Sequence, residues 1–223
     1  MTDEISMSIK TMPALKIGFC QLDEESVSSI NNYVDENAEN VDDHSNKLVG
    51  QIKQNNKSSQ LALNMKDEVP YKFGKFLVWF AEKYAAEHNI FAKEYNISNM
   101  WTVHSYAGDY NPLHEHGTET GRGISCILYL KVPALVDSYD TCKSDLGSFN
   151  LKNNSGLCDG YTQFIWGSNG NRDIFNFKHL TDTFVRPEVG KLIMFPIWLK
   201  HQVMPFFGEG ERRSLSVNID IHV

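Results

Sequence analysis

The sequence has few cysteines, no long hydrophobic run and no excess of positive charge. Its four cysteines, Cys20, Cys126, Cys142 and Cys158, lie far apart without CxxC spacing, which is typical of free thiols in a reducing compartment. No apolar run approaches the ~18 residues of a membrane helix, and no charged-then-apolar leader opens the chain. We therefore expect a cytoplasmic protein with no membrane span.

The charge balance is acidic, with 28 Asp and Glu against 21 Lys and Arg and a net charge of -7 over 223 residues. A binder of nucleic-acid backbones needs a basic surface to neutralise phosphates, so we expect no nucleic-acid partner. Near residue 97 the pattern changes from helical to strand-and-turn. We expect an N-terminal strand and helical region over 1–96, packed on a strand-rich domain over 97–223.

Helical periodicity is confined to the first part of the chain. Acidic residues at 23–25, followed by apolar residues at helical spacing, predict a helix over 23–37 after a strand within 11–22. A stripe of aromatic residues predicts a second helix over 71–89 that covers one face of a sheet. The intervening polar segment predicts a loop in which His44 is solvated.

Short strand candidates separated by turn signals dominate the rest of the sequence. They include residues 101–106, 123–133, 161–166 and 175–180, whereas most of the segment 134–186 has no clear pattern. Many short strands that follow covering helices predict an all-β core with flanking helices, an α+β arrangement built as a sandwich or jelly-roll barrel.

Three histidines are candidate metal ligands. On a strand, His114 and His116 project to one side, roughly 6 to 7 Å apart at a rise of ~3.3 Å per residue, while Glu115 points to the other. Two neutral imidazoles can share one divalent ion. His201 follows an apolar strand near the C-terminus, and Trp198 is expected to pack beneath that strand.

Three ordered motifs resemble the iron(II)- and 2-oxoglutarate-dependent oxygenases, within them the prolyl-hydroxylase-like branch. They are NPLHEH at 111–116, GKLIMFPIWLKHQVMP at 190–205 and RRSLSVN at 212–218. The resemblance covers roughly residues 97–223. It implies a double-stranded β-helix, a cupin-like jelly roll with the N-terminal helices on one sheet. It also implies a dioxygenase that hydroxylates a C–H bond with Fe(II), 2-oxoglutarate and O2, with ascorbate as a reductant.

The resemblance also implies roles for individual residues. The metal ligands are His114, His116 and His201. Arg212 binds the distal carboxylate of 2-oxoglutarate with Ser214 as a helper, because a guanidinium fork matches a carboxylate, and Arg213 is the alternative. Tyr129 and Tyr106 match tyrosines near the two ends of the co-substrate. Further candidates for the pocket are Asn218, Arg213 and His104.

The sequence departs from the family at the position of the usual carboxylate ligand, where it has His116. This leaves three interpretations: a working three-histidine site, a bulge that turns Glu115 or Glu119 inward, or a site without oxygenase activity. Two other function classes stay open, namely a three-histidine cupin-type or zinc enzyme that does not use 2-oxoglutarate, and a non-catalytic jelly roll that binds a sugar or a protein. The substrate, implied to be a prolyl or other peptide side chain, could also be a small metabolite or lipid, and the oligomeric state stays open.

Overall fold

The structure is a computed structural model that describes residues 15–39, 42–45, 59–137, 158–167 and 181–223. Three helices are described: α1 (Glu24–Asn37), α2 (Glu68–Glu87) and α3 (Ala134–Asp137). The strands are β1 (Gly18–Gln21), β2 (Gln60–Ala62), β3 (Glu94–Ser105), β4 (Asn111–His114), β5 (Gly123–Lys131), β6 (Thr162–Ile165), β7 (Asp182–Val185), β8 (Lys191–Pro196), β9 (Lys200–Val203) and β10 (Arg212–His222).

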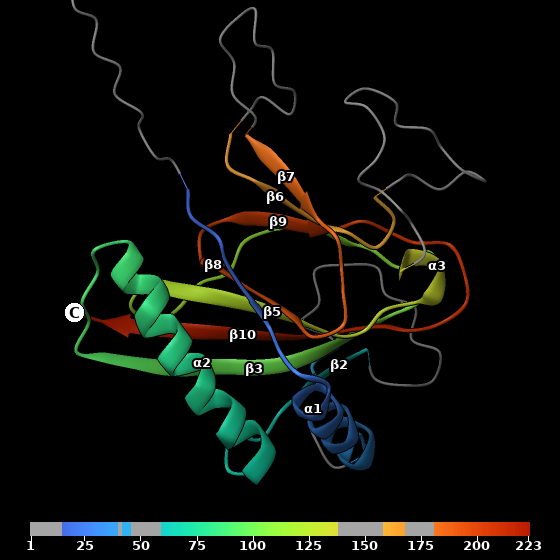
Figure 1. The fold of residues 1–223 in the computed structure, drawn as a ribbon, viewed down its shortest axis with the longest axis horizontal. Helices are drawn as coiled ribbons and strands as arrows, with labels where there is room; N and C mark the ends of the chain where they lie inside the picture. Colours follow the sequence, from blue (N-terminus) through green and yellow to red (C-terminus); the bar gives the residue numbers. More distant parts are fainter. Residues whose placement is uncertain (1–14, 40–41, 46–58, 138–157, 168–180) are drawn as a thin grey trace, which may run out of the picture.

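The strands form two antiparallel sheets that face each other as a jelly roll. The large sheet has the order β1-β8-β5-β10-β3-β2 and the small sheet has the order β4-β9-β6-β7. Figure 1 shows α1 and α2 on the side of the large sheet that faces away from β6, β7 and β9. This arrangement matches the all-β core with flanking helices that the sequence predicts.

Alternation along the central strands divides the core into two layers. On β5, Ile127 and Tyr129 face the small sheet, where they pack with Phe164 of β6. Cys126 and Leu128 point to the opposite face and join a cluster that includes buried residues of α1 and α2. The large sheet is therefore buried on both faces, and its small-sheet side forms one wall of the functional pocket.

Each long helix has an aspartate at its N-cap, Asp23 for α1 and Asp67 for α2. Asp23 caps α1 by accepting a hydrogen bond from the Ser26 backbone N–H at 2.7 Å, so this helix begins where the acidic residues predict. The second helix begins at Glu68, three residues before the predicted start. Strand β7 lies in the segment without a clear pattern, and the strand candidate at 175–180 lies outside the described residues.

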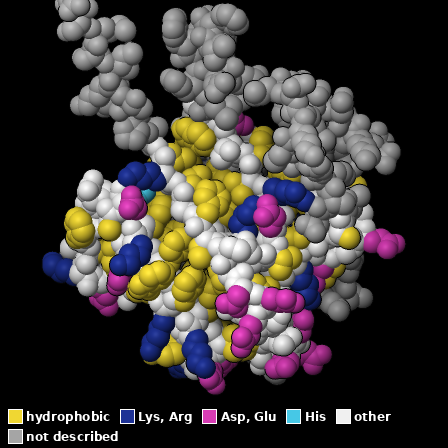
Figure 2. All heavy atoms as spheres, in the orientation of Figure 1, with side chains coloured by type: hydrophobic (Ala, Val, Ile, Leu, Met, Phe, Trp, Pro, Cys, Tyr) yellow, Lys and Arg dark blue, Asp and Glu magenta, His cyan; other side chains and the backbone are white. Residues whose placement is uncertain are grey.

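Cys20, Cys126 and Cys158 are free thiols, as predicted, and Cys142 lies outside the described residues. No helix within the described residues is long and apolar enough to cross a membrane. Figure 2 shows hydrophobic side chains gathered in the middle of the face that carries β1 and α2. The most exposed large hydrophobic residues of these two elements are Phe19 on β1 and Trp79 on α2.

Candidate active site

Three histidines from two neighbouring strands meet between the sheets. His114 ends β4 and lies directly opposite His201 of β9 in the strand register. The prediction that His116 shares a strand with His114 is wrong, because β4 ends at His114. The His116 backbone N–H instead donates to the Ile197 carbonyl at 3.2 Å, which holds the segment after β4 against the turn between β8 and β9.

The three imidazoles converge on one point. Their ring centroids lie 5.2 Å apart for His114 and His116, 4.3 Å for His114 and His201, and 5.0 Å for His116 and His201. One ring nitrogen from each lies within 4.8 Å of the others, and among the described residues this is the only group of three or more such side chains placed to hold a metal ion.

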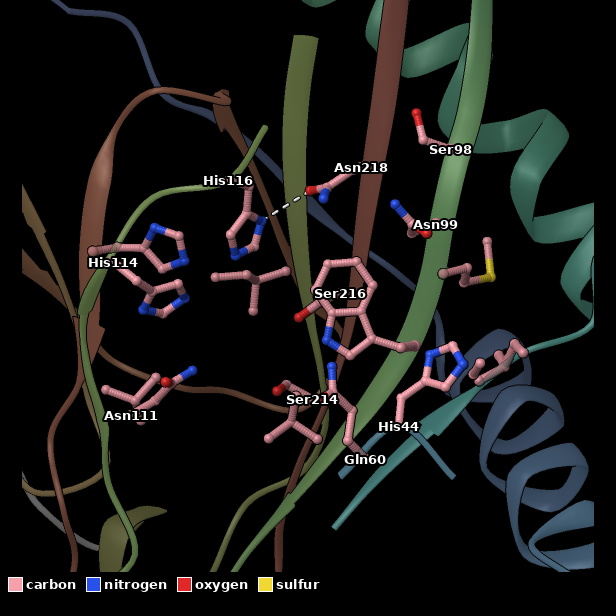
Figure 3. Close-up of a pocket in the computed structure, with 18 of the residues that line it drawn as sticks. His44, Gln60, Ser98, Asn99, Asn111, His114, His116, Ser214, Ser216 and Asn218 are labelled. Carbon is pink, nitrogen blue, oxygen red and sulfur yellow. Dashed lines mark hydrogen bonds between the residues drawn. The ribbon is translucent and has the colours of Figure 1, made fainter. Parts of the chain in front are cut away.

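Hydrogen bonds give all three rings the same tautomer. Nδ1 of His114 donates to the Pro112 carbonyl at 2.6 Å, and Nδ1 of His201 donates to the Leu199 carbonyl at 3.0 Å. Nδ1 of His116 donates to Oδ1 of Asn218 at 2.9 Å (Figure 3). Because a neutral imidazole with a protonated Nδ1 keeps its lone pair on Nε2, each ring presents Nε2 as a free donor.

Burial keeps these rings neutral. It lowers the pKa of His114 and of His116, against hydrogen bonds to Pro112 and Asn218 that favour protonation. Burial, together with the nearby His114 and His116, lowers the pKa of His201 to about 3. Neutral imidazoles are the form that binds a metal ion, so no proton has to leave these rings for binding at neutral pH.

Neither glutamate near the motif takes the place of a carboxylate ligand. The β4–β9 pairing is irregular between Asn111 and His114, yet this irregularity does not turn a carboxylate inward. Glu115 lines the pocket but is exposed and outside the metal-ligating group, and Glu119 is exposed and outside the lining. The geometry therefore favours the three-histidine interpretation over the inward bulge.

The histidines open onto a cavity of about 400 Å³ between the sheets. Strand β10 supplies one wall through Arg212, Ser214, Ser216 and Asn218, which alternate with Leu215, Val217 and Ile219 of the helix-covered core. This division of faces follows from the alternation of side chains along a strand. It places Ser214, the predicted helper, and Asn218 on the pocket wall.

Arg212 is buried in this wall and has no anionic partner within the part of the chain that the structure describes. Its side chain is 1 % exposed, and no carboxylate among the described residues forms a salt bridge with it. Nε donates to the Gly160 carbonyl at 2.9 Å and Nη2 to Oγ1 of Thr162 at 3.3 Å. Burial lowers the pKa of Arg212, against the opposing influence of Tyr129. A buried cation of this kind is suited to an anionic ligand, because such a ligand would supply the missing countercharge.

Tyr129 and Thr162 complete the surroundings of the guanidinium. The Tyr129 hydroxyl is hydrogen-bonded to Oγ1 of Thr162 at 2.7 Å, and Cζ of Arg212 lies 5.1 Å from the Tyr129 ring centroid. Tyr129 therefore lies beside Arg212, although it does not itself line the cavity. Sequence reasoning missed Thr162, because the local pattern of the strand candidate over 161–166 does not indicate that it lies beside Arg212.

Arg213 and His104 lie outside the pocket lining, although the sequence indicated both as pocket candidates. Arg213 pairs with Asp35 of α1 at 2.7 Å and with Glu211 at 3.0 Å. His104 contacts the same glutamate at 2.5 Å through Nδ1 and lies 2.8 Å from Thr102 through Nε2. Burial alone would raise the pKa of Glu211, but hydrogen bonds from His104 and Arg213 lower it to about 2. This network ties α1 to the start of β10.

Three further expectations need correction. Tyr106 is absent from the pocket lining, and burial together with the charge of Glu211 raises its pKa, so it belongs with that network. Trp198 is 54 % exposed and does not pack beneath the strand. His44 is half-buried and lines the pocket, although its polar neighbours in the sequence suggested a solvated side chain. The backbone N–H of His44 donates to the Gln60 carbonyl at 2.9 Å, which brings His44 to the pocket.

The jelly roll and its three converging histidines match the fold and the ligand positions that the sequence resemblance implies for a non-haem metal oxygenase. A model of the family described as "Putative 2OG-Fe(II) oxygenase" matches residues 99–218, more than half of the chain. This chain belongs to that family of 2-oxoglutarate- and Fe(II)-dependent oxygenases. No curated protein matches the sequence.

Solved structures share this fold at low sequence identity. A prolyl-4-hydroxylase from Pseudomonas putida is 12 % identical, with a TM-score of 0.58 and coverage of 94 % of each chain. The viral collagen prolyl hydroxylase of Paramecium Bursaria Chlorella virus-1, in a 2OG complex, is 15 % identical, with a TM-score of 0.52 and coverage of 91 % of this chain and 94 % of that one. The alpha-ketoglutarate-dependent epimerase SnoN from nogalamycin biosynthesis is 10 % identical, with a TM-score of 0.60 and coverage of 93 % and 79 %.

Proposed function

We propose that this oxygenase hydroxylates a C–H bond of its substrate with Fe(II) held by His114, His116 and His201 and with 2-oxoglutarate held by Arg212. The observation that carries the proposal is the shared tautomer of the three rings, each with Nδ1 bonded to an oxygen and Nε2 free. Partners that orient ligating imidazoles in this way are typical of metal sites. Three imidazole donors suit Fe(II), although they lack the negative charge of the usual carboxylate.

The second half of the proposal is the carboxylate site at Arg212. Arg212 offers a buried guanidinium, and the Thr162 hydroxyl beside it bonds both Arg212 and Tyr129. A dicarboxylate anchored here by charge-assisted hydrogen bonds would extend along the β10 wall towards the histidines. Ser214 lies on this wall and is assigned as a helper. Tyr106 has no part in the proposal, because it lies outside the pocket lining.

When bound, Fe(II) with 2-oxoglutarate and O2 supplies an oxidation in which the substrate gains one oxygen atom as a hydroxyl group, and the co-substrate leaves as succinate and CO2. The protein residues hold the ligands, orient the co-substrate and limit the access of water. A three-histidine zinc or cupin-type enzyme would leave Arg212, Thr162 and Tyr129 without a ligand to bind, so the pocket favours the oxygenase.

For the substrate we propose a peptide side chain, with a prolyl residue as one example. The support is the likeness in fold to a bacterial prolyl-4-hydroxylase and a viral collagen prolyl hydroxylase, which is an analogy. Ascorbate as a reductant and a cytoplasmic location stay predictions from the sequence.

The test is anaerobic titration of the purified protein with Fe(II) and 2-oxoglutarate, followed by O2. We expect a weak visible charge-transfer band from bidentate 2-oxoglutarate on Fe(II), and succinate after O2 is admitted. Loss of the band in Arg212→Ala, with metal still bound, would support the assigned carboxylate site. Stoichiometric metal without any band in the wild-type protein would refute the proposal in favour of a three-histidine enzyme that does not use 2-oxoglutarate.

A further inference from the structure

The pocket continues well beyond the three histidines. In Figure 3, His44, Gln60, Ser98 and Asn99 lie on the side opposite His114 and His116, with Ser214, Ser216 and Asn218 between the two groups. We call this far part the distal end, which is lined by His44, Gln60, Leu63, Met65, Ser98 and Asn99. All but Asn99 lie outside residues 99–218, so the matched family region does not supply most of this surface.

Trp101 joins the distal end to the histidines. Its indole ring centroid lies 5.6 Å from that of His116. The Gln60 amide satisfies both of its neighbours when its oxygen faces the indole, because Oε1 then accepts from Trp101 Nε1 at 2.6 Å and Nε2 donates to the His44 carbonyl at 3.1 Å. These contacts fix the Trp101 ring as a rigid wall that runs from the histidines into the distal end.

A β-bulge on β3 shapes the solvent-exposed rim of the distal end. Along the β3–β10 pairing, Asn218 lies opposite Asn99 but Ile219 lies opposite Ile97, so Ser98 is an extra residue on β3. Bulges commonly redirect side chains next to active sites. Here Ser98 and Asn99 both line the pocket although they are adjacent in the sequence, and both are exposed.

Among the residues that the structure describes, the distal end carries no formally charged Lys, Arg, Asp or Glu side chain. Over the described part of the whole lining, the only such residues are Arg212, assigned to the co-substrate, and the exposed Glu115. Gln60, Ser98 and Asn99 contribute amides and a hydroxyl, and Trp101 contributes an aromatic surface. A charged ligand group beside the buried Gln60 would lose hydration without gaining an ion pair from the described residues, so this described surface selects against charge.

A buried acceptor in the pocket indicates that the ligand carries hydrogen-bond donors. Oδ1 of Asn111 is buried and has no hydrogen-bond partner among the described residues, and Asn111 lines the same pocket. Ionised 2-oxoglutarate has only acceptor oxygens, so the donor has to come from another molecule. A peptide offers one N–H donor and one C=O acceptor per residue, which complements the amides of Asn111 and Asn99.

The cavity of about 400 Å³ also has to hold the co-substrate, and it is near the lower limit for pockets that enclose a single drug-sized ligand. A substrate therefore inserts one group and continues outwards past the exposed Ser98 and Asn99. We propose that the distal end is a specificity subsite for an uncharged peptide segment that flanks the oxidised residue. This inference rests on the proposed function. It adds the charge class of the substrate and the residues that distinguish a charged from an uncharged segment.

The test uses the full-length Fe(II)-loaded protein with 2-oxoglutarate and O2, with succinate above background as the readout. The probes are three pools of N-acetylated, C-amidated hexapeptides, one uncharged, one with lysine and one with glutamate, and maltohexaose as a neutral glycan. Asn99→Asp places a negative charge at the rim of the subsite. Asn32→Asp on α1 is the matched control, because Asn32 is exposed and outside the pocket lining.

We expect the uncharged pool to stimulate wild-type succinate release most. Asn99→Asp should shift the preference towards the lysine pool, relative to the uncharged pool, by about fivefold, as expected for opposite unit charges near 4 Å in water. Asn32→Asp should leave this preference unchanged. Wild-type preference for a charged pool, stimulation by maltohexaose alone, no stimulation by any peptide pool, or equal behaviour of the two variants would each overturn the subsite. The charge-transfer band separates these failures from failure of the proposed function, because only the latter removes the band.

Discussion

Replacing Arg212 and Arg213 separately by methionine should separate ligand binding from fold stability. Both guanidinium groups are buried at the start of β10, but only Arg213 has carboxylate partners among the described residues, namely Asp35 and Glu211. Arg212 has the Gly160 carbonyl and the Thr162 hydroxyl as neutral acceptors. We therefore expect opposite phenotypes from the same chemical change at adjacent positions.

The magnitudes follow from burial and pairing. Arg212→Met removes a buried cation, which is favourable, and leaves the Gly160 carbonyl without its donor at about 1–3 kcal/mol, whereas Thr162 keeps its hydrogen bond with Tyr129. We therefore expect the free energy of unfolding to change by less than about 2 kcal/mol. Arg213→Met breaks a buried pair with Glu211, whose cost we place at about 3 kcal/mol because the Asp35 side chain is 52 % exposed. At about 2–4 °C per kcal/mol for a chain of this size, that lowers Tm by roughly 6–12 °C.

The assay is anaerobic thermal unfolding of the Fe(II)-loaded proteins with and without 2-oxoglutarate. At 100 times Kd, the co-substrate should stabilise the wild-type protein by about 2.7 kcal/mol, or roughly 5–11 °C. Arg213→Met should keep this shift despite its lower Tm, and Arg212→Met should lose it. A full 2-oxoglutarate shift in Arg212→Met would refute the assignment, and its loss in Arg213→Met alone would move the carboxylate site to Arg213.

Three further predictions concern the residues around the histidines and the charged network. Asn218→Ala should weaken Fe(II) binding by about 10–100-fold in a chelator competition, because His116 loses the acceptor that orients it. The control Ser216→Ala, on the same wall, should bind Fe(II) normally. Equal Fe(II) affinities of the two variants would show that Asn218 does not orient the His116 ring. His116→Ala should abolish the 2-oxoglutarate charge-transfer band, and a retained band would mean that His116 is not a ligand. The pKa of Glu211 is lowered from 4.5 to about 2 in the folded protein, so ionised Glu211 should stabilise the fold by about 3 kcal/mol above pH ~4.5, and this stability should be lost as the pH falls towards 2. Denaturant titrations of Glu211→Gln over this pH range should lack that loss of stability. If Glu211→Gln shows the same dependence of stability on pH as the wild-type protein, the prediction is contradicted.

Local patterns were sufficient for several features of this protein. The side-chain period of two along the last strand predicts which residues share a face, and the structure places Arg212, Ser214 and Asn218 together on the pocket wall. The acidic start and apolar spacing predict α1 because capping and amphipathicity are properties of a short segment. Order and spacing of the motifs also indicated the family, which the family model confirms.

Pairing between strands far apart in the sequence decided which side chains meet in the pocket. Alternation cannot say which face of β10 meets the helices, so only the packing of Leu215 against the helical layer selects Arg212 over Arg213 for the pocket. His116 leaves the strand that the sequence predicts, and its tautomer depends on Asn218, which is 102 residues away. The distal end brings His44 and Gln60 to Trp101 through β2, a three-residue strand. The sequence by itself determined the candidate ligands and the fold class, because both follow from local residue order. Tertiary structure decided which side chains meet, because strand register and sheet packing bring together residues that no local pattern connects.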